Sequence, residues 1–349
     1  MTEPLTFGAP VAIHPDADPL DDIRWADGRA EVDTAWMIDH LQGWFPRGAS
    51  SPVLGDPHHV LDPLAVLAAA SATTRRVGLG VAVTDPVRRT NVALAHTAST
   101  ISWLSGRRFK LGIGAGDPGQ LRPFGLHSGT ERTGRLHYVR PALEQLSALR
   151  TPDSPGWDAD LPIAHRPGYD LCVAAHGPRM LELTALHGDG WIPSSITPAD
   201  YGHKLGRLRR HAELAGRDPA SVGPMLFLWT ALAGTRKESR ALLDHPTVRA
   251  VALYRGRAAF EAAGFRYPLD HSYIPQEIAP GDAEALLRRI PDQIVEASVL
   301  HGSPAEVRRR LDEYHRAGCA HVILWDIGRF ADRDGAERFR EAFTTIARA

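Results

Sequence analysis

The fold is decided by the stretch Trp36-Met37-Ile38-Asp39-His40-Leu41-Gln42-Gly43-Trp44-Phe45-Pro46. Residues 35–38 are an apolar run that ends abruptly on an acid and an imidazole. Because a parallel strand buried on both faces is nearly continuously apolar, polar side chains mark the carboxyl end where it opens to solvent. Ligands bind at that end in barrels and in open α/β sheets. We therefore expect His40 to be an acid/base beside a planar redox cofactor that Asp39 helps to hold. The alternative is that Asp39 caps the next helix and His40 is a hydrogen-bonded core histidine.

Strands and helices alternate along the whole chain, which is typical of the α/β class with a parallel sheet. Eight strands are expected, beginning near Leu5, Thr34, Arg76, Phe109, Leu171, Gly190, Pro224 and His321. Eight is the number of strands that closes a (β/α)8 barrel. No linker divides the chain. We therefore predict a single TIM-barrel domain over residues 1–349, with insertions at about 43–61 and 236–300.

Composition and charge exclude several classes of protein. The 349 residues carry a net charge of −1 at pH 7 and are 43% hydrophobic, enough for a large core. This charge gives no support for a nucleic-acid or membrane-surface partner. The sequence shows no signal peptide and no apolar stretch long enough to span a bilayer. We expect a cytoplasmic protein that acts on a small molecule.

Neither the two cysteines nor the histidines of the loop at 43–61 support a metal site. Cys172 and Cys319 are too few for a disulfide framework or a four-cysteine zinc site, and small core residues are their simplest interpretation. His58 and His59 lie near two acids, but adjacent histidines in a proline-rich loop are poorly spaced to share a ligand role. No metal is expected.

A second strand end has the sequence Gly114-Ala115-Gly116-Asp117-Pro118-Gly119, which fits the spacing G-x-G-x-x-G. A dinucleotide-binding fold needs a helix at the last glycine and an acid about 20 residues further on. Here only loop is expected up to about residue 131, and no strand-ending acid stands near residue 138. We expect instead small residues that let a flat ligand approach the backbone, with Asp117 as a polar contact. A simple glycine turn is the alternative.

A third strand end has the sequence Ala174-Ala175-His176-Gly177-Pro178-Arg179-Met180 and enters a helix. Pro178 stands at or near the first helical position. The free N–H groups of a helix start, with Arg179 nearby, make a natural phosphate site, and an ordinary turn is the alternative. Earlier in the chain, Arg88-Arg89 is expected to be a solvated pair; contact with an acidic cofactor tail is the alternative.

Taken in order, these segments resemble the luciferase-like superfamily and, within it, the coenzyme F420-dependent oxidoreductases. The resemblance covers residues 34–192. It rests on Asp39-His40 with Trp44, on residues 83–89 (VTDPVRR), on residues 111–117 (LGIGAGD), and on residues 174–183 (AAHGPRMLEL) followed by Asp189-Gly190-Trp191. The later insertion and residues 301–304 are similar to the branch that contains phthiodiolone-type ketoreductases, methylenetetrahydromethanopterin reductases and F420-dependent glucose-6-phosphate dehydrogenases.

The resemblance implies a role for each site residue. The implied catalytic residues are His40, Asp117 and Trp44; Trp44 would wall the substrate pocket, although a buried structural tryptophan is the alternative. The implied cofactor-binding residues are Asp39, Thr84, Asp85, Ala115, Gly116, Asp117, Ala175, His176, Gly177, Pro178 and Arg179. Thr84 would lie at a bulge of the third strand, where relatives often have a cis peptide bond before a residue other than proline. Many relatives have glutamate where Asp117 stands, so this side chain is one methylene shorter.

The resemblance also implies the reaction. F420 would exchange a hydride at C5 with a carbonyl, an imine or an activated alkene, or with an alcohol in the reverse direction, and His40 would donate or accept the proton. The rival functions are an FMN-dependent luciferase-like monooxygenase and a barrel that binds a ligand without catalysis. The two insertions would select the substrate. A homodimer is expected because the family usually forms dimers.

Overall fold

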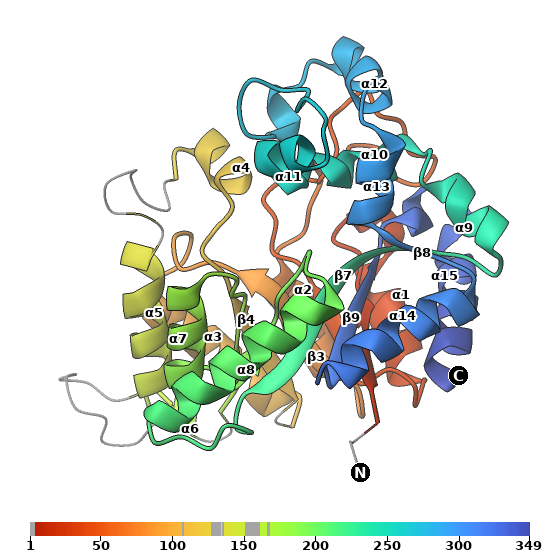
Figure 1. The fold of residues 1–349 in the computed structure, drawn as a ribbon. Helices are drawn as coiled ribbons and strands as arrows, with labels where there is room; N and C mark the ends of the chain where they lie inside the picture. Colours follow the sequence, from red (N-terminus) through yellow and green to blue (C-terminus); the bar gives the residue numbers. More distant parts are fainter. Residues whose placement is uncertain (1–3, 107, 127–133, 135, 151–160, 166–167) are drawn as a thin grey trace.

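Eight parallel strands close into a barrel at the centre of the protein (Figure 1). The computed structural model describes residues 4–106, 108–126, 134, 136–150, 161–165 and 168–349. Around the barrel the strands follow in the order β1 (Thr6–Pro10), β2 (Thr34–Met37), β3 (Gly78–Thr84), β4 (Phe109–Ile113), β5 (Asp170–Val173), β6 (Gly190–Trp191), β7 (Gly223–Leu232) and β9 (His321–Asp326). Strand β9 pairs with β1 and closes the ring. The predicted (β/α)8 barrel is confirmed.

One further strand, β8 (Leu300–Gly302), is not expected from the sequence. It pairs with residues 230–232 at the end of β7, whereas β9 pairs with β7 only as far as Thr230. Strand β8 therefore lies beside the closed ring and is not one of its members. Three residues are too few for an alternating pattern of apolar and polar side chains, so no sequence signal marks it.

Helices cover the outside of the barrel. The longer ones are α1 (Pro19–Asp27), α2 (Pro63–Ser71), α3 (Asn91–Leu104), α5 (Leu136–Ala148), α7 (Pro178–His187), α8 (Pro198–Leu214), α14 (Pro304–Arg316) and α15 (Gly335–Arg348). Shorter turns are η1 (Pro15–Ala17), α4 (Pro118–Leu121), η2 (Arg122–Phe124), α6 (Pro162–His165) and η5 (Gly328–Phe330). Side-chain oxygens of Asp62, Thr90, Thr197 and Ser303 accept hydrogen bonds from the first N–H groups of α2, α3, α8 and α14, which fixes where these helices begin.

Three sequence-based expectations fall at least partly outside the described residues. They are the start of the helix predicted from residue 131, much of the connection at 151–168, and the first three residues of the chain.

The insertion at 236–300 is a group of short helices that lies above the barrel in Figure 1. Its elements are α9 (Arg236–Leu242), α10 (Pro246–Arg249), η3 (Ala250–Arg255), α11 (Gly256–Ala262), η4 (Pro275–Glu277), α12 (Pro280–Arg288) and α13 (Asp292–Ser298). The insertion is bound to the loop at 43–61, because Trp44 Nε1 donates to the carbonyl of Thr247 at 2.8 Å and the Tyr273 hydroxyl donates to the carbonyl of Trp44 at 3.0 Å. The two insertions therefore form one layer over the barrel.

Strand β3 is irregular near its carboxyl end. Its register against β4 shifts between Val81 and Thr84, and the Ala82–Val83 peptide bond is cis. Both features stand where the resemblance predicts them.

Both cysteines are free thiols buried in the core, as predicted. Burial raises the pKa of the Cys172 and Cys319 thiols, which keeps them protonated and unreactive. Each helix in the described part of the chain is too short or too polar to cross a membrane.

Candidate active site

The carboxyl ends of six neighbouring strands, β2 to β7, surround a cavity of about 430 Å³. This is the size range of small-molecule sites. The predicted site residues that line it are Asp39, His40, Thr84, Asp85, Ala115, Gly116, Asp117 and His176. The predicted site residues that do not line it are Trp44, Ala175, Gly177, Pro178 and Arg179. Eight of the thirteen predicted site residues therefore lie together at one cavity, where they are eight of its twenty lining residues.

His40 follows β2 and is half-buried against the cavity. Its Nδ1 atom is buried and has no hydrogen-bond partner in the described part of the chain, so His40 is not the hydrogen-bonded core histidine of the alternative interpretation. Burial, followed by the nearby Arg88 and His14, lowers the pKa of His40 to about 3. The imidazole is therefore neutral at pH 7, with one nitrogen able to donate and the other able to accept a hydrogen bond.

Asp39 caps no helix; both of its carboxylate oxygens are bound by arginines. Arg88 donates to Asp39 Oδ1 at 2.8 Å, and Arg89 donates to Asp39 Oδ2 at 2.7 Å. Arg88 also donates to Asp85 Oδ2 at 2.7 Å. The Arg88 side chain is only 7% exposed, so the expectation of a solvated arginine pair is wrong. Asp85 Oδ1 accepts the backbone N–H groups of Val87 and Arg88, and this turn brings Arg88 to Asp39.

The glycine-rich end of β4 forms one wall of the cavity. Gly116 has a φ of +75°, a left-handed conformation that favours glycine. A Cβ atom on Gly114 would lie 2.7 Å from Val83 Cγ2, so the two strand ends approach closely here. Asp117 Oδ1 accepts the N–H of Gly119 at 3.0 Å and caps the short helix α4. The expectation that only loop follows Asp117 is wrong, because an aspartate before a proline is itself a helix-start signal.

The end of β5 leads over the rim of the cavity into α7. His176 lines the cavity, whereas Ala175 is fully buried and its carbonyl accepts a hydrogen bond from Trp191 Nε1 at 2.9 Å. Gly177 is the N-cap of α7 and supplies no side-chain cap, so the first N–H groups of this ten-residue helix point to solvent or to a ligand. A Cβ atom at Gly177 would meet nothing within 4 Å, so the space in front of the helix is open.

The sequence reasoning missed three polar residues of the cavity, Gln120, Ser194 and Tyr254. Gln120 Oε1 accepts the N–H groups of Leu41 and Gln42 at 2.8 and 3.0 Å, which holds the loop after His40. Gln120 Nε2 and the Tyr254 hydroxyl are buried and form no hydrogen bond within the described residues. With His40 Nδ1, these atoms give the cavity three unpartnered polar groups. Such groups are costly unless a ligand or water satisfies them.

Trp44 is the predicted catalytic residue that the structure does not bring to the cavity. It is 1% exposed and packs its ring against His14, Phe45 and Phe330. This environment favours the alternative interpretation, a buried tryptophan that connects the two insertions.

A (β/α)8 barrel with a cavity of unpartnered polar groups at the strand ends has the architecture of an enzyme that acts on small molecules. The sequence profile described as luciferase-like monooxygenase matches residues 29–321. The chain belongs to this family.

Relatives and solved structures agree with this assignment. The chain is 29% identical over 326 residues to the phthiodiolone/phenolphthiodiolone dimycocerosates ketoreductase of Mycobacterium bovis (strain BCG / Pasteur 1173P2), with 84% of this chain and 83% of the relative covered. It is 23% identical over 305 residues to the 5,10-methylenetetrahydromethanopterin reductase of Archaeoglobus fulgidus, with 83% and 84% covered. A solved F420-dependent secondary alcohol dehydrogenase, in complex with an F420-acetone adduct, has the same fold with a TM-score of 0.75, 17% identity and 99% of both chains covered.

Proposed function

We propose that this protein is a coenzyme F420-dependent oxidoreductase. It transfers a hydride between deazaflavin C5 and a small organic substrate, which is a carbonyl, an imine or an activated alkene, or an alcohol in the reverse direction. The observation that carries the proposal is that His40, with its unpartnered Nδ1, lines the same cavity as the glycine-rich end of β4. Two F420-dependent enzymes of the same fold, a secondary alcohol dehydrogenase and a tetrahydromethanopterin reductase, support the choice of cofactor, and the names of the reductase relatives support a reduction.

The residues of the site fit a flat cofactor that carries a phosphate. The wall at 114–117 presents small side chains and backbone to the cavity. The start of α7 offers the N–H groups of Arg179 and Met180 and the positive end of a helix dipole, which together favour an anion. Gly177, Pro178 and Arg179 would hold the phosphate, and Ala115 to Asp117 would lie against the ring.

When bound, F420 supplies or accepts the hydride at C5. His40 moves the proton that balances it: to the carbonyl oxygen in reduction, or from the alcohol hydroxyl in oxidation. At pH 7 His40 is unprotonated and can accept a proton, but a pKa lowered to about 3 makes it a weak base until a ligand changes its surroundings. An anionic ligand beside it would offset the charge of Arg88, raise the pKa and favour donation. Asp39 and Arg88 act as positioning residues, because they fix the end of β2 that carries His40.

The test is a cofactor titration of the purified protein. Quenching of F420 fluorescence gives its dissociation constant, and FMN is titrated in parallel. Micromolar or tighter binding of F420 with much weaker binding of FMN is the expected result, and it would justify screening carbonyl, imine and enone acceptors. The opposite preference would favour the FMN-dependent monooxygenase, which the family description makes the main rival. Binding of neither would sink both redox functions.

Two other expectations remain predictions. The protein is expected to form a homodimer, which light scattering after size-exclusion chromatography would check. The cytoplasm is the expected compartment, which fractionation of the native cells would check.

A further inference from the structure

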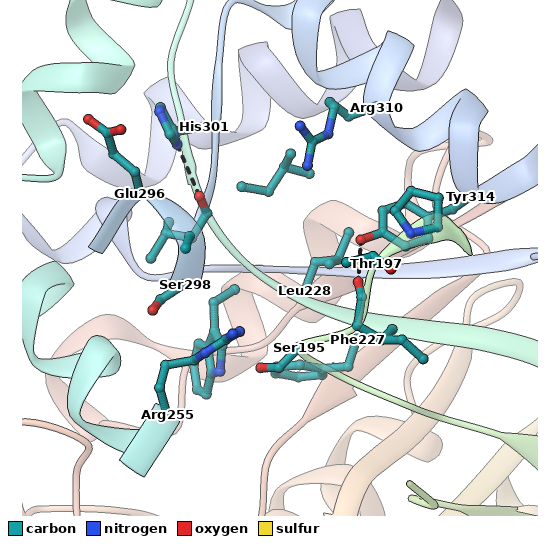
Figure 2. A pocket seen from close by; sticks show the side chains of 16 residues that line it. Ser195, Thr197, Phe227, Leu228, Arg255, Glu296, Ser298, His301, Arg310 and Tyr314 are labelled. Carbon is teal, nitrogen blue, oxygen red and sulfur yellow. Dashed lines mark hydrogen bonds between the residues drawn. The ribbon is translucent and has the colours of Figure 1, made fainter. Parts of the chain in front are cut away.

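Three neighbouring cavities with shared lining residues lie between His40 and the insertion at 236–300. The cavity described above shares His40 and Asp117 with a middle cavity of about 170 Å³. The middle cavity shares Arg255 and Ser298 with an outer cavity of about 380 Å³ (Figure 2). Trp229, near the end of β7, lines all three. A molecule that reaches His40 can therefore extend past Trp229 toward the insertion.

Arg255 lies where the middle and outer cavities meet. It is the last residue of η3 and lines both of them. Figure 2 shows its side chain extending toward the space between Ser195 and Ser298. The same two serines line both cavities with it.

The Arg255 guanidinium has neither a hydrogen bond nor an ion pair with any described residue, although it is half-buried. Other half-buried or buried arginines near it are paired. Arg249, in the same insertion, donates to Asp292 at 2.8 Å and to the Leu287 carbonyl at 3.1 Å. Glu296 lines the outer cavity, but its carboxylate is bound by Arg240 at 2.9 Å. A half-buried guanidinium without an acid is a strong candidate for binding an anion, because its five donors match a carboxylate.

The rest of the middle cavity suits the body of an organic molecule. Val251, Trp229 and Tyr254 supply apolar and aromatic surface between His40 and Arg255. Neither cavity that contains Arg255 is lined by a residue of α7. The Arg255 guanidinium is therefore separate from the start of α7, which would hold the cofactor phosphate.

We propose that the substrate is an organic anion, and that Arg255 binds its carboxylate while its reacting carbon lies by His40. This inference rests on the proposed function, because it names the substrate class of that same site. The substrate has an apolar body between the two ends, which contacts Trp229. Arg255 is a specificity-determining residue and takes no part in the proton or hydride transfer.

Binding without cofactor tests the inference directly. The probes are straight-chain carboxylates of four to eight carbons and the matching neutral amides, measured by calorimetry or by ligand-observed NMR. The wild-type protein should bind the best carboxylate about ten-fold or more tightly than its amide, as a charge-assisted pair requires. Arg255→Gln should weaken carboxylate binding about ten- to hundred-fold and leave amide binding unchanged. The matched control is Arg266→Gln, since Arg266 is exposed, belongs to the same insertion and lines none of the three cavities. It should behave as wild type.

A second experiment with the cofactor tests whether Arg255 binds the carboxylate of the substrate or that of F420, because F420 itself carries an acidic tail. The dissociation constants of F420 and of the tail-less deazaflavin should be the same for Arg255→Gln and wild type. A loss confined to F420 would assign Arg255 to the tail and overturn the inference, as would equal binding of acids and amides or binding of neither. The protein could bind FMN and not F420 and still prefer carboxylates to amides in a way that depends on Arg255. That result would refute the proposed cofactor and support the anion site.

Discussion

His40 combines two properties that are rarely found together in a structural histidine. It borders a cavity, and its buried Nδ1 has no partner among the described residues. Replacing His40 with alanine should lower kcat by about 10²- to 10⁴-fold, because it removes the group that transfers the proton. The affinity for F420 should change little, since the proposed phosphate site lies on α7 and not at His40. The control is His59→Ala, an exposed histidine of the loop at 43–61. Steady-state kinetics and F420 titration measure both effects, and an unchanged kcat in His40→Ala would refute its role.

At the scale of single residues, the sequence predicted what lies next to a strand end and missed what arrives from far along the chain. Asp39 and His40 directly follow an apolar run, so the local pattern is sufficient. Gln120 reaches the backbone of Leu41 across 79 residues, and Tyr254 comes from the second insertion. Periodicity carries no information on such contacts. Trp44 illustrates the opposite error, because nearness in sequence to His40 did not bring its side chain to the cavity.

At the scale of elements, the ends of β2 and β3 are joined by buried ion pairs. The Asp39 side chain is 2% exposed and is bound by two arginines. Asp39→Ala should destabilise the protein by about 2–3 kcal/mol, because it removes two buried charge-assisted hydrogen bonds, while Arg88 keeps Asp85 and Arg89 keeps Asp62 as partners. The matched control is Asp244→Ala: Asp244 lies 3.9 Å from Arg249 and is 71% exposed. A pair of that kind contributes about 0–1 kcal/mol. Urea denaturation measures both variants, and a loss below about 1 kcal/mol for Asp39→Ala would contradict the prediction.

A substitution at the start of α7 can change the affinity for F420 without lowering the stability of the protein. Gly177 has a φ of −84° and open space around it, so a side chain fits without strain. Gly177→Asp should keep or slightly raise the melting temperature, because aspartate is a good N-cap. It should weaken F420 binding about ten-fold, because a carboxylate would then stand at the proposed phosphate site and repel the phosphate. Gly177→Asn is the neutral control and should bind F420 more tightly than Gly177→Asp. Equal affinities for the two variants would count against a phosphate site at this helix.

The elements themselves were largely predictable, and the exceptions have physical causes. Seven of the eight barrel strands are four residues or longer and, like the long helices, are mostly apolar, whereas β6 has only two residues and was expected from its place after α7. Strand β8 has three residues and α4 has four, so neither generates a periodic signal. The arginine pair after β3 is charged, and its burial depends on Asp39, a partner 49 residues away for Arg88.

At the scale of the whole molecule, closure of the barrel depends on β9, which contacts both β1 and β7. The last residue of β9, Asp326, is buried, and its Oδ1 accepts hydrogen bonds from the Thr230 hydroxyl at 3.1 Å and the Leu232 N–H at 2.7 Å. Its Oδ2 has no partner within the described residues. Burial raises the pKa of Asp326 from 3.8 to about 6. The carboxylate that helps to close the barrel is therefore costly to ionise.

This cost makes stability depend on pH in a direction opposite to that of a salt-bridged aspartate. Between pH 4 and 6 the folded protein binds a proton at Asp326 that the unfolded chain does not, so its contribution to stability grows as the pH falls through 6. A shift of this size corresponds to about 3 kcal/mol. Asp326→Asn keeps an acceptor for Thr230 and Leu232 and removes the titration. The free energy of unfolding of the variant, minus that of wild type, should therefore be about 2 kcal/mol more positive at pH 7.5 than at pH 4, where the unfolded carboxyl is itself partly protonated. Urea denaturation across this range measures the difference, and a constant value would show that Asp326 ionises in the folded protein as it does in the unfolded chain.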